Sequence, residues 1–245
     1  MRKFAIGLGL TKASLLALVF IVSFSGCQTA SSSKIETAPV AVATPTPQIS
    51  DDNINRPTSE PYVGDLSIFE SEDRAKNLQI ERVMDILKIT TGKSVADIGA
   101  GGGWFSVRAA KRVGNSGKVF AVEISQDDLN FIDERAKKEN LPNIQTVLGA
   151  EDNPKLPENS IDAVLILKTY HEIAQPVKEL ENLRPSLKKD ALVGVIDRSG
   201  NGADHGVNKE TVIDEFKRAG FSLVDQYDFV KPDGMDYFLV FKLAN

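Results

Sequence analysis

The chain has 245 residues, a formal net charge of −5 at pH 7, and 42% hydrophobic residues. The negative charge argues against a nucleic-acid-binding protein, which normally presents a basic patch. Cys27 is the only cysteine, which excludes an internal disulfide and a cysteine-rich zinc site. Two histidines, His171 and His205, are few for a multi-histidine metal site, so we predict that no metal is bound.

Residues 1–26 have the pattern of a secretion signal. Basic residues at the start precede an apolar run at 13–24, which is shorter than the roughly 20 residues of a membrane-spanning helix. Small residues then stand directly before Cys27. The pattern resembles a bacterial lipoprotein signal, which implies cleavage before Cys27 and a lipid anchor on it. The expected location is the bacterial cell envelope, on the periplasmic side of the outer membrane. The alternative is an ordinary signal in which Cys27 is incidental.

Residues 27–60 are rich in Ser, Thr, Ala and Pro and show neither helical nor strand periodicity. Such a segment buries too little apolar surface to offset the entropy lost on ordering. We therefore expect a disordered tether between the anchor and a single domain at 61–245.

From residue 71 onward, helices alternate with strands. Each predicted strand is short and mainly apolar, and each predicted helix carries an apolar stripe. The expected helices are 71–87, 104–113, 125–138, 176 to about 185, and 210–219. The expected strands are 94–98, 118–123, 144–148, 161–167, 191–197, 221–229 and 235–243.

Nearly continuous apolar strands alternating with helices indicate a parallel sheet covered on both faces. The last two strands follow each other without a helix, which introduces one antiparallel strand. The predicted fold class is therefore α/β: a Rossmann-like, seven-stranded, mostly parallel sheet with helices on both faces.

A glycine-rich loop follows the first predicted strand. Gly99, Gly101 and Gly103 allow a tight turn and a close approach of the backbone to a ligand. The helix that follows adds free N–H groups and positive potential. Asp97 stands two residues before the first glycine, and Glu123 ends the next strand, where a carboxylate can accept both hydroxyls of a ribose.

Two cofactor classes use this arrangement. The dinucleotide fingerprint requires a third glycine at the position of Trp104, so a nicotinamide cofactor is disfavoured. The segment 97–103 resembles motif I of the class I methyltransferases, which use S-adenosylmethionine (SAM), and Glu123 resembles their following acidic residue. The resemblance implies that Asp97, the three glycines and Glu123 bind SAM.

Further segments extend this resemblance. Residues 149–162 and 184–196 are similar to the corresponding runs of small-molecule methyltransferases of the ubiquinone-biosynthesis and arsenite-methylating types. Ala150 replaces the acidic residue that these enzymes place near the adenine. The role then falls to Asp152 or Glu151, and we assign Asp152 as a cofactor-binding residue.

The segment after the fourth strand faces the methyl group in a sheet of this kind, because ligands bind beyond the carboxyl ends of the strands. His171 is our candidate base or acceptor-positioning residue, since histidine titrates near neutral pH. Tyr170 is the second catalytic candidate, through its ring or its hydroxyl. We expect Trp104 and Phe105 to pack the first helix, and His205 is a weaker candidate for a lid.

The expected function is methyl transfer from SAM to a small-molecule or lipid-like acceptor. The chain shows no basic groove or added domain for a nucleic acid. Partners are therefore the acceptor and, through lipidated Cys27, the membrane, with the chain a monomer or a weak dimer. A non-catalytic SAM- or nucleoside-binding lipoprotein is the alternative, and a nicotinamide-dependent oxidoreductase is the third interpretation.

Overall fold

A computed structural model describes residues 56–60, 64, 66–231 and 233–244 of the chain. The predicted signal, Cys27 and most of the predicted tether lie outside these residues. Among the described helices, none has the length and apolar character needed to cross a membrane.

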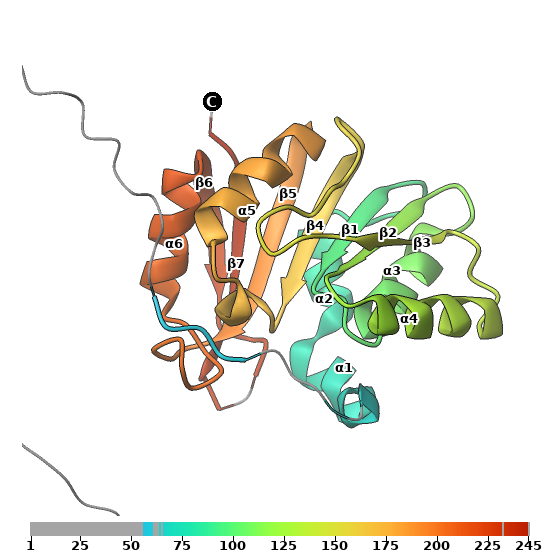
Figure 1. Ribbon diagram of the computed structural model, residues 1–245, viewed down its shortest axis with the longest axis horizontal. Coiled ribbons are helices and arrows are strands. Elements are labelled where there is room, and N and C mark those ends of the chain that lie inside the picture. Colours follow the sequence, from blue (N-terminus) through green and yellow to red (C-terminus); the bar gives the residue numbers. More distant parts are fainter. Residues whose placement is uncertain (1–55, 61–63, 65, 232, 245) are drawn as a thin grey trace, which may run out of the picture. The chain divides into compact units, whose positions relative to one another are not determined.

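The described chain is built on a seven-stranded sheet in the order β3-β2-β1-β4-β5-β7-β6 (Figure 1). β1 to β5 are parallel, and β7 runs antiparallel to both of its neighbours. This confirms the predicted fold class. The strands are β1 (Ser94–Ile98), β2 (Lys118–Glu123), β3 (Ile144–Leu148), β4 (Ile161–Leu167), β5 (Leu187–Arg198), β6 (Phe221–Tyr227) and β7 (Asp236–Leu243).

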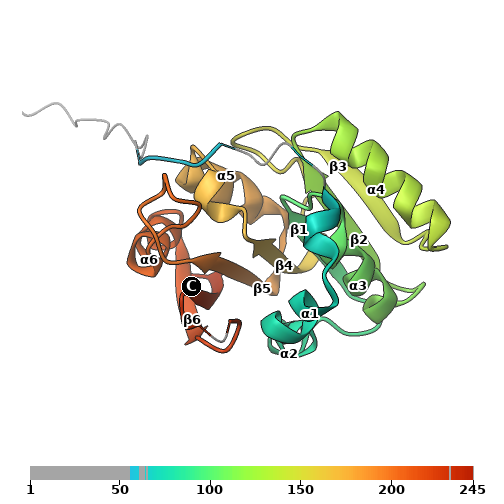
Figure 2. The same ribbon diagram turned by 90° about the horizontal axis from the view of Figure 1, so that it is seen from below.

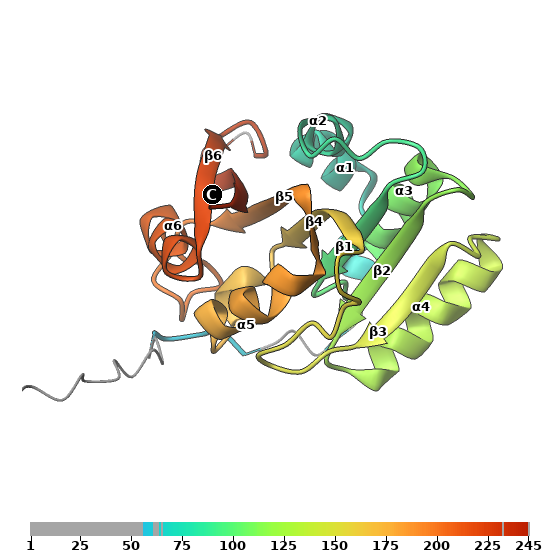
Figure 3. The ribbon, with the colours of Figure 1, turned by 90° about the horizontal axis from the view of Figure 1, so that it is seen from above.

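Helices cover both faces of the sheet. In Figure 2, α1 and α2 lie on one side of the sheet and α5 lies on the other. Figure 3 shows α6 near β6 and α4 beside β3, at opposite ends of the sheet. The helices are α1 (Glu72–Leu78), α2 (Ile80–Ile86), α3 (Trp104–Val113), α4 (Gln126–Lys138), α5 (Pro176–Leu183) and α6 (Lys209–Arg218).

Local side-chain chemistry stabilises the ends of two helices. The Ser125 hydroxyl accepts a hydrogen bond from the Asp128 N–H at the start of α4, which satisfies one of the free donors of that helix. Pro176 occupies the first turn of α5, where a missing N–H costs nothing. Pro185 lies in a short 3-10 turn that ends the helical segment.

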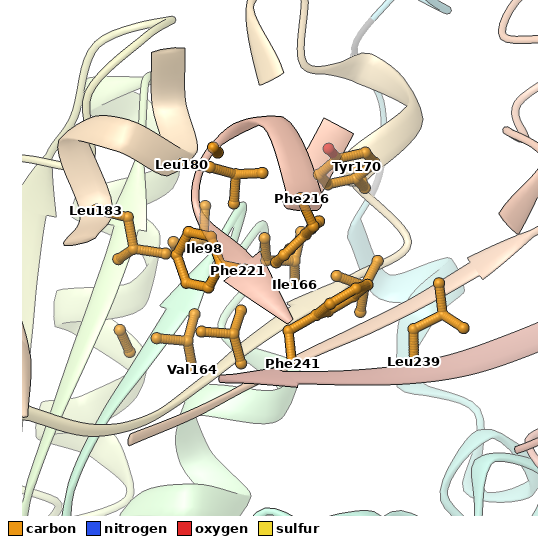
Figure 4. Close-up of a cluster of buried hydrophobic side chains, with 14 of the residues drawn as sticks. Ile98, Val164, Ile166, Tyr170, Leu180, Leu183, Phe216, Phe221, Leu239 and Phe241 are labelled. Carbon is orange, nitrogen blue, oxygen red and sulfur yellow. The ribbon is translucent and has the colours of Figure 1, made fainter. Parts of the chain in front are cut away.

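Between the sheet and helices α5 and α6, an aromatic core fixes the position of both helices. Phe216 of α6 stacks on Phe241 of β7 with ring centroids 3.8 Å apart, and Phe221 packs edge-on against Phe216 (Figure 4). All three rings are buried. Burial of each such side chain contributes roughly 1.5–3 kcal/mol, so this cluster anchors the end of the sheet that carries β6 and β7.

Two predicted elements were wrong in their extent. The helix expected at 71–87 is broken at Gln79, whose φ is 46°. Leu78 and Ile80 are both buried, and residues two apart cannot share one face of a continuous helix. The break therefore lets both side chains reach the core. β5 begins at Leu187, before the predicted start, and slips in register against β4 at this end.

Part of the predicted tether packs against the domain. Arg56 donates from Nε to Glu215 Oε1 at 2.8 Å and from Nη2 to the Tyr170 carbonyl at 3.0 Å. The Ser59 hydroxyl donates to the Gly202 carbonyl at 2.9 Å. Residues 56–60 thus belong structurally with the domain, and in Figure 1 they run beside the loops at the carboxyl ends of the strands. No helical or strand periodicity in residues 56–60 indicates these contacts.

We predict that Arg56→Ala lowers the free energy of unfolding by about 3 kcal/mol, because it leaves the buried carboxyl of Glu215 without its cation. Denaturant unfolding of the full chain measures this change. Lys137→Ala, at an exposed position of α4, is the matched control and should change stability by less than about 0.5 kcal/mol. Equal effects of the two substitutions would contradict a stabilising role for Arg56.

Candidate functional site

The loop from β1 to α3 depends on its glycines. Gly99, Gly101 and Gly103 have φ values of 70°, 52° and 72°, in the left-handed region that side-chain-bearing residues avoid. A Cβ on Gly99 would lie 2.2 Å from the Thr169 side chain, so the loop also touches the end of β4. A Cβ on Gly101 would meet no atom of the described residues within 4 Å. Gly101 therefore presents bare backbone to open space.

Glu123 holds this loop from the end of β2. Its Oε1 accepts a hydrogen bond from the Gly101 N–H at 2.6 Å, and its Oε2 accepts one from the Ile124 N–H at 3.1 Å. Burial raises the pKa of the Glu123 carboxyl. Glu123 and the glycine loop, which we predicted to bind one cofactor, therefore lie in direct contact.

Asp97 lies deeper, at the end of β1. It is buried and accepts a hydrogen bond from the Ser106 hydroxyl of α3 at 2.6 Å. Burial raises the pKa of Asp97 to about 7, although the Ser106 hydrogen bond acts in the opposite direction. Asp97 is therefore partly protonated near neutral pH. Ser106 was not among the predicted site residues, because a buried serine in a helix carries no distinctive sequence signal.

These groups line a cavity of about 360 Å³ at the carboxyl ends of β1, β2 and β4. This volume lies in the range of small-molecule pockets. Its wall includes the glycine loop with Asp97, the end of β2 with Glu123, the segment after β4, and residues that precede α2. Side chains from α3, α4, α5 and residues 150–151 complete it.

Arg74 supplies a cation to the cavity wall that sequence reasoning missed. Its guanidinium lies 4.5 Å from the centroid of the Trp104 ring, and the Arg108 guanidinium lies 3.8 Å from the same centroid. Burial lowers the pKa of Arg74 to about 10, which leaves it charged at neutral pH. Trp104 packs at the start of α3, as expected, but it also lines the cavity.

The segment after β4 corrects one catalytic assignment. Residues Tyr170–Glu172 form a 3-10 turn, in which successive side chains point about 120° apart. Tyr170 is fully buried and its ring lies 5.7 Å from that of Phe216, in the core shown in Figure 4. Tyr170, predicted to act on a ligand, therefore does not line the cavity. Glu172, on another side of the turn, lines the cavity instead.

His171 is buried directly behind Glu172. Its Nδ1 lies 2.9 Å from Asp197 Oδ1, and its backbone N–H donates to Asp197 Oδ2 at 3.0 Å. A carboxylate only accepts, so Nδ1 carries the hydrogen and Nε2 faces Glu172 Oε1 at 3.7 Å. His171 is thus oriented by a buried carboxylate from β5, a partner that the sequence did not indicate.

Two predicted cofactor residues lie off the cavity wall. The Asp152 carboxylate forms an ion pair with Lys178 at the protein surface, and the cavity is lined by Ala150 and Glu151 instead. Of the two acids considered for the position near the adenine, the structure therefore favours Glu151. Gly103 caps α3 and packs near Ile132 of α4, so its role is to shape the loop.

Comparison with known proteins gives this geometry a context. Residues 95–190, from β1 into β5, match the family model described as a methyltransferase domain. This segment contains Asp97, the glycine loop, Glu123 and His171. Residues 95–190 are thus similar to a methyltransferase domain.

Individual relatives agree with this result. Aklanonic acid methyltransferase DauC from Streptomyces sp. (strain C5) is 30% identical over 125 residues, which are 51% of this chain and 50% of the relative. (S)-Coclaurine N-methyltransferase from Thalictrum flavum subsp. glaucum is 28% identical over 123 residues, 50% of this chain and 34% of the relative. The chain thus spans half or less of the length of these curated relatives.

Among solved structures, a SAM-dependent methyltransferase from Aquifex aeolicus superposes with a TM-score of 0.66. The alignment has 23% identity and covers 73% of this chain and 96% of that one. This likeness concerns the fold.

The cavity wall also carries a buried acid. Glu179 of α5 is buried, and among the described residues its Oε2 has no hydrogen-bond partner. Burial, with a smaller contribution from Asp152, raises the pKa of Glu179 to about 8. Between pH 4.5 and 8 the unfolded chain therefore releases a proton that the folded chain retains, so rising pH destabilises the fold through this group.

We predict that Glu179→Gln, which keeps the shape and removes the titration, stabilises the protein by about 3 kcal/mol at pH 8 and by almost nothing at pH 4.5. Denaturant unfolding across this pH range provides the measurement. Glu181→Gln, at an exposed position of the same helix, should leave the pH dependence unchanged. A constant difference between wild type and Glu179→Gln at all pH values would refute the raised pKa.

Proposed function

We propose that the chain binds SAM in this cavity and transfers its methyl group to a small-molecule or lipid-like acceptor. The observation that carries the proposal is the pairing of Glu123 with the exposed backbone of Gly101 at the edge of the cavity. In this proposal Glu123 accepts hydrogen bonds from the ribose hydroxyls. Ile124 and Glu151 would flank the adenine, and Arg74 would pair with the methionine carboxylate, since all three line the cavity.

The reaction is an in-line displacement. The acceptor's lone pair forms a bond to the methyl carbon while the bond from that carbon to sulfur breaks, and S-adenosylhomocysteine leaves. Orientation and exclusion of water provide most of the acceleration for such a step. A hydroxyl or amine acceptor must also lose a proton, and we assign its removal to Glu172 on the wall or to His171 behind it.

We predict that Glu123→Ala weakens SAM binding roughly ten- to a hundredfold, because a charged hydrogen bond contributes about 1.5–3 kcal/mol. Isothermal titration calorimetry with SAM measures the effect. Asp152→Asn is the matched control, since this acid pairs with Lys178 away from the cavity. Unchanged affinity in a folded Glu123→Ala variant would disprove the placement of the ribose. Binding without formation of S-adenosylhomocysteine from any acceptor would favour a non-catalytic binding protein.

The cellular location is a separate proposal, supported by the signal-like residues 1–26 and by Cys27. We infer that the protein is anchored by lipid in the bacterial envelope, on the periplasmic side of the outer membrane. Cys27→Ser should then abolish incorporation of labelled fatty acid and leave a longer precursor on a gel. Wild-type protein that carries no lipid and retains Met1 would show that Cys27 is incidental.

A further inference from the structure

Both histidines of the chain meet beside the cavity. One nitrogen of His171, one nitrogen of His205 and a carboxylate oxygen of Glu172 all lie within 4.8 Å of one another. The two imidazole rings stand edge to face, with centroids 5.9 Å apart and an interplanar angle of 87°. His205 comes from the loop after β5 and Glu172 from the turn after β4, so only the fold brings this set together.

The buried histidine is already oriented as a ligand. Asp197 is fully buried and holds His171 Nδ1 at 2.9 Å, so the lone pair is on Nε2, which lies 3.7 Å from Glu172 Oε1. Metal-bound histidines commonly donate their second ring N–H to a carboxylate in this way, which fixes the ring and increases its basicity. Asp197 also accepts from two backbone N–H groups, those of His171 and Arg198, which fixes the carboxylate itself.

The exposed histidine has a left-handed backbone conformation. His205 has a φ of 56°, in the left-handed region that few non-glycine residues occupy. Its backbone N–H donates to the Ser59 hydroxyl at 2.9 Å, and that hydroxyl donates to the Gly202 carbonyl at 2.9 Å. Strain of this kind persists where the surrounding structure enforces it, and it concentrates at ligand sites.

Two imidazoles and one carboxylate are the ligand set of zinc and non-haem ferrous sites that leave coordination positions open. Two ligand atoms on one ion can be at most about 4.2 Å apart, given bonds of about 2.1 Å. The present separation of up to 4.8 Å therefore requires only a small rotation. Glu172 is partly exposed and His205 is exposed, so both side chains have room for it.

We propose that His171, Glu172 and His205 bind a divalent transition-metal ion, of the zinc or ferrous class, at the acceptor side of the cavity. The two histidines are too few for a closed multi-histidine site, which is why the sequence argued against a metal. They are sufficient once Glu172 joins them. When bound, the ion acts as a Lewis acid toward an acceptor oxygen or nitrogen and lowers its pKa. His171 is then a metal ligand, and the acceptor's proton leaves to water or a wall carboxylate.

The test uses the full chain, purified without a histidine tag and stripped with a chelator. Calorimetric titration with Zn²⁺, and the visible absorption of bound Co²⁺, should show one ion per chain. His205→Ala and Glu172→Gln change partly exposed groups, so they should fold normally and weaken Zn²⁺ binding at least tenfold. Asp197→Asn should weaken it roughly 10- to 100-fold through its hold on His171. Glu158→Gln, at an exposed carboxyl in the turn before β4, is the control and should bind as wild type does.

Metal binding does not depend on the proposed methyl transfer, so the two ideas fail separately. Glu123→Ala should bind Zn²⁺ normally, and His205→Ala should bind SAM normally. Absence of one-to-one binding by the wild-type chain overturns the metal site. So does binding that survives both His205→Ala and Glu172→Gln, because the ion then lies elsewhere.

Discussion

The site depends on a single constraint, the passage of the β1–α3 loop between Thr169 and Glu123. At Gly99 the backbone is so close to Thr169 that no side chain fits, and at Gly101 its N–H is fixed by Glu123. Three residues of the loop adopt positive φ values, so only glycine satisfies the turn without strain. The same turn leaves bare backbone along the cavity. The cofactor side is therefore set by one short segment and the strand next to it.

This locality explains which features the sequence predicted. The strands were found because buried parallel strands are continuous apolar runs, and the loop was found because its glycines and acids lie close together along the chain. The predicted site residues that do not line the cavity are those whose role required a particular side-chain direction. Tyr170 and Asp152 have the right position in sequence, but one turns into the core and the other turns to Lys178. Neither direction follows from spacing alone.

Charge on the cavity wall is arranged to favour a cation. Asp97, Glu123 and Glu179 all have pKa values raised by burial, which disfavours the ionised forms of these acids. A positively charged sulfonium nearby would stabilise their ionised forms, since opposite charges in a poorly solvated site attract strongly. Arg74 offers the opposite charge at another part of the wall. A zwitterionic amino acid with an added positive centre matches this distribution better than a polyanion such as a dinucleotide.

The cluster of His171, Glu172 and His205 is assembled in a different way, from segments distant in sequence. Asp197 from β5 orients His171, and Ser59 from the residues that precede α1 fixes the loop of His205. Arg56 ties the same segment to α6 and to the carbonyls of Tyr170 and His171. These contacts hold the two histidines, and none of them involves the glycine loop. The cofactor could consequently be inferred from local motifs. The grouping of His171 with Glu172 and His205 exists only in the folded chain and could not be inferred in this way.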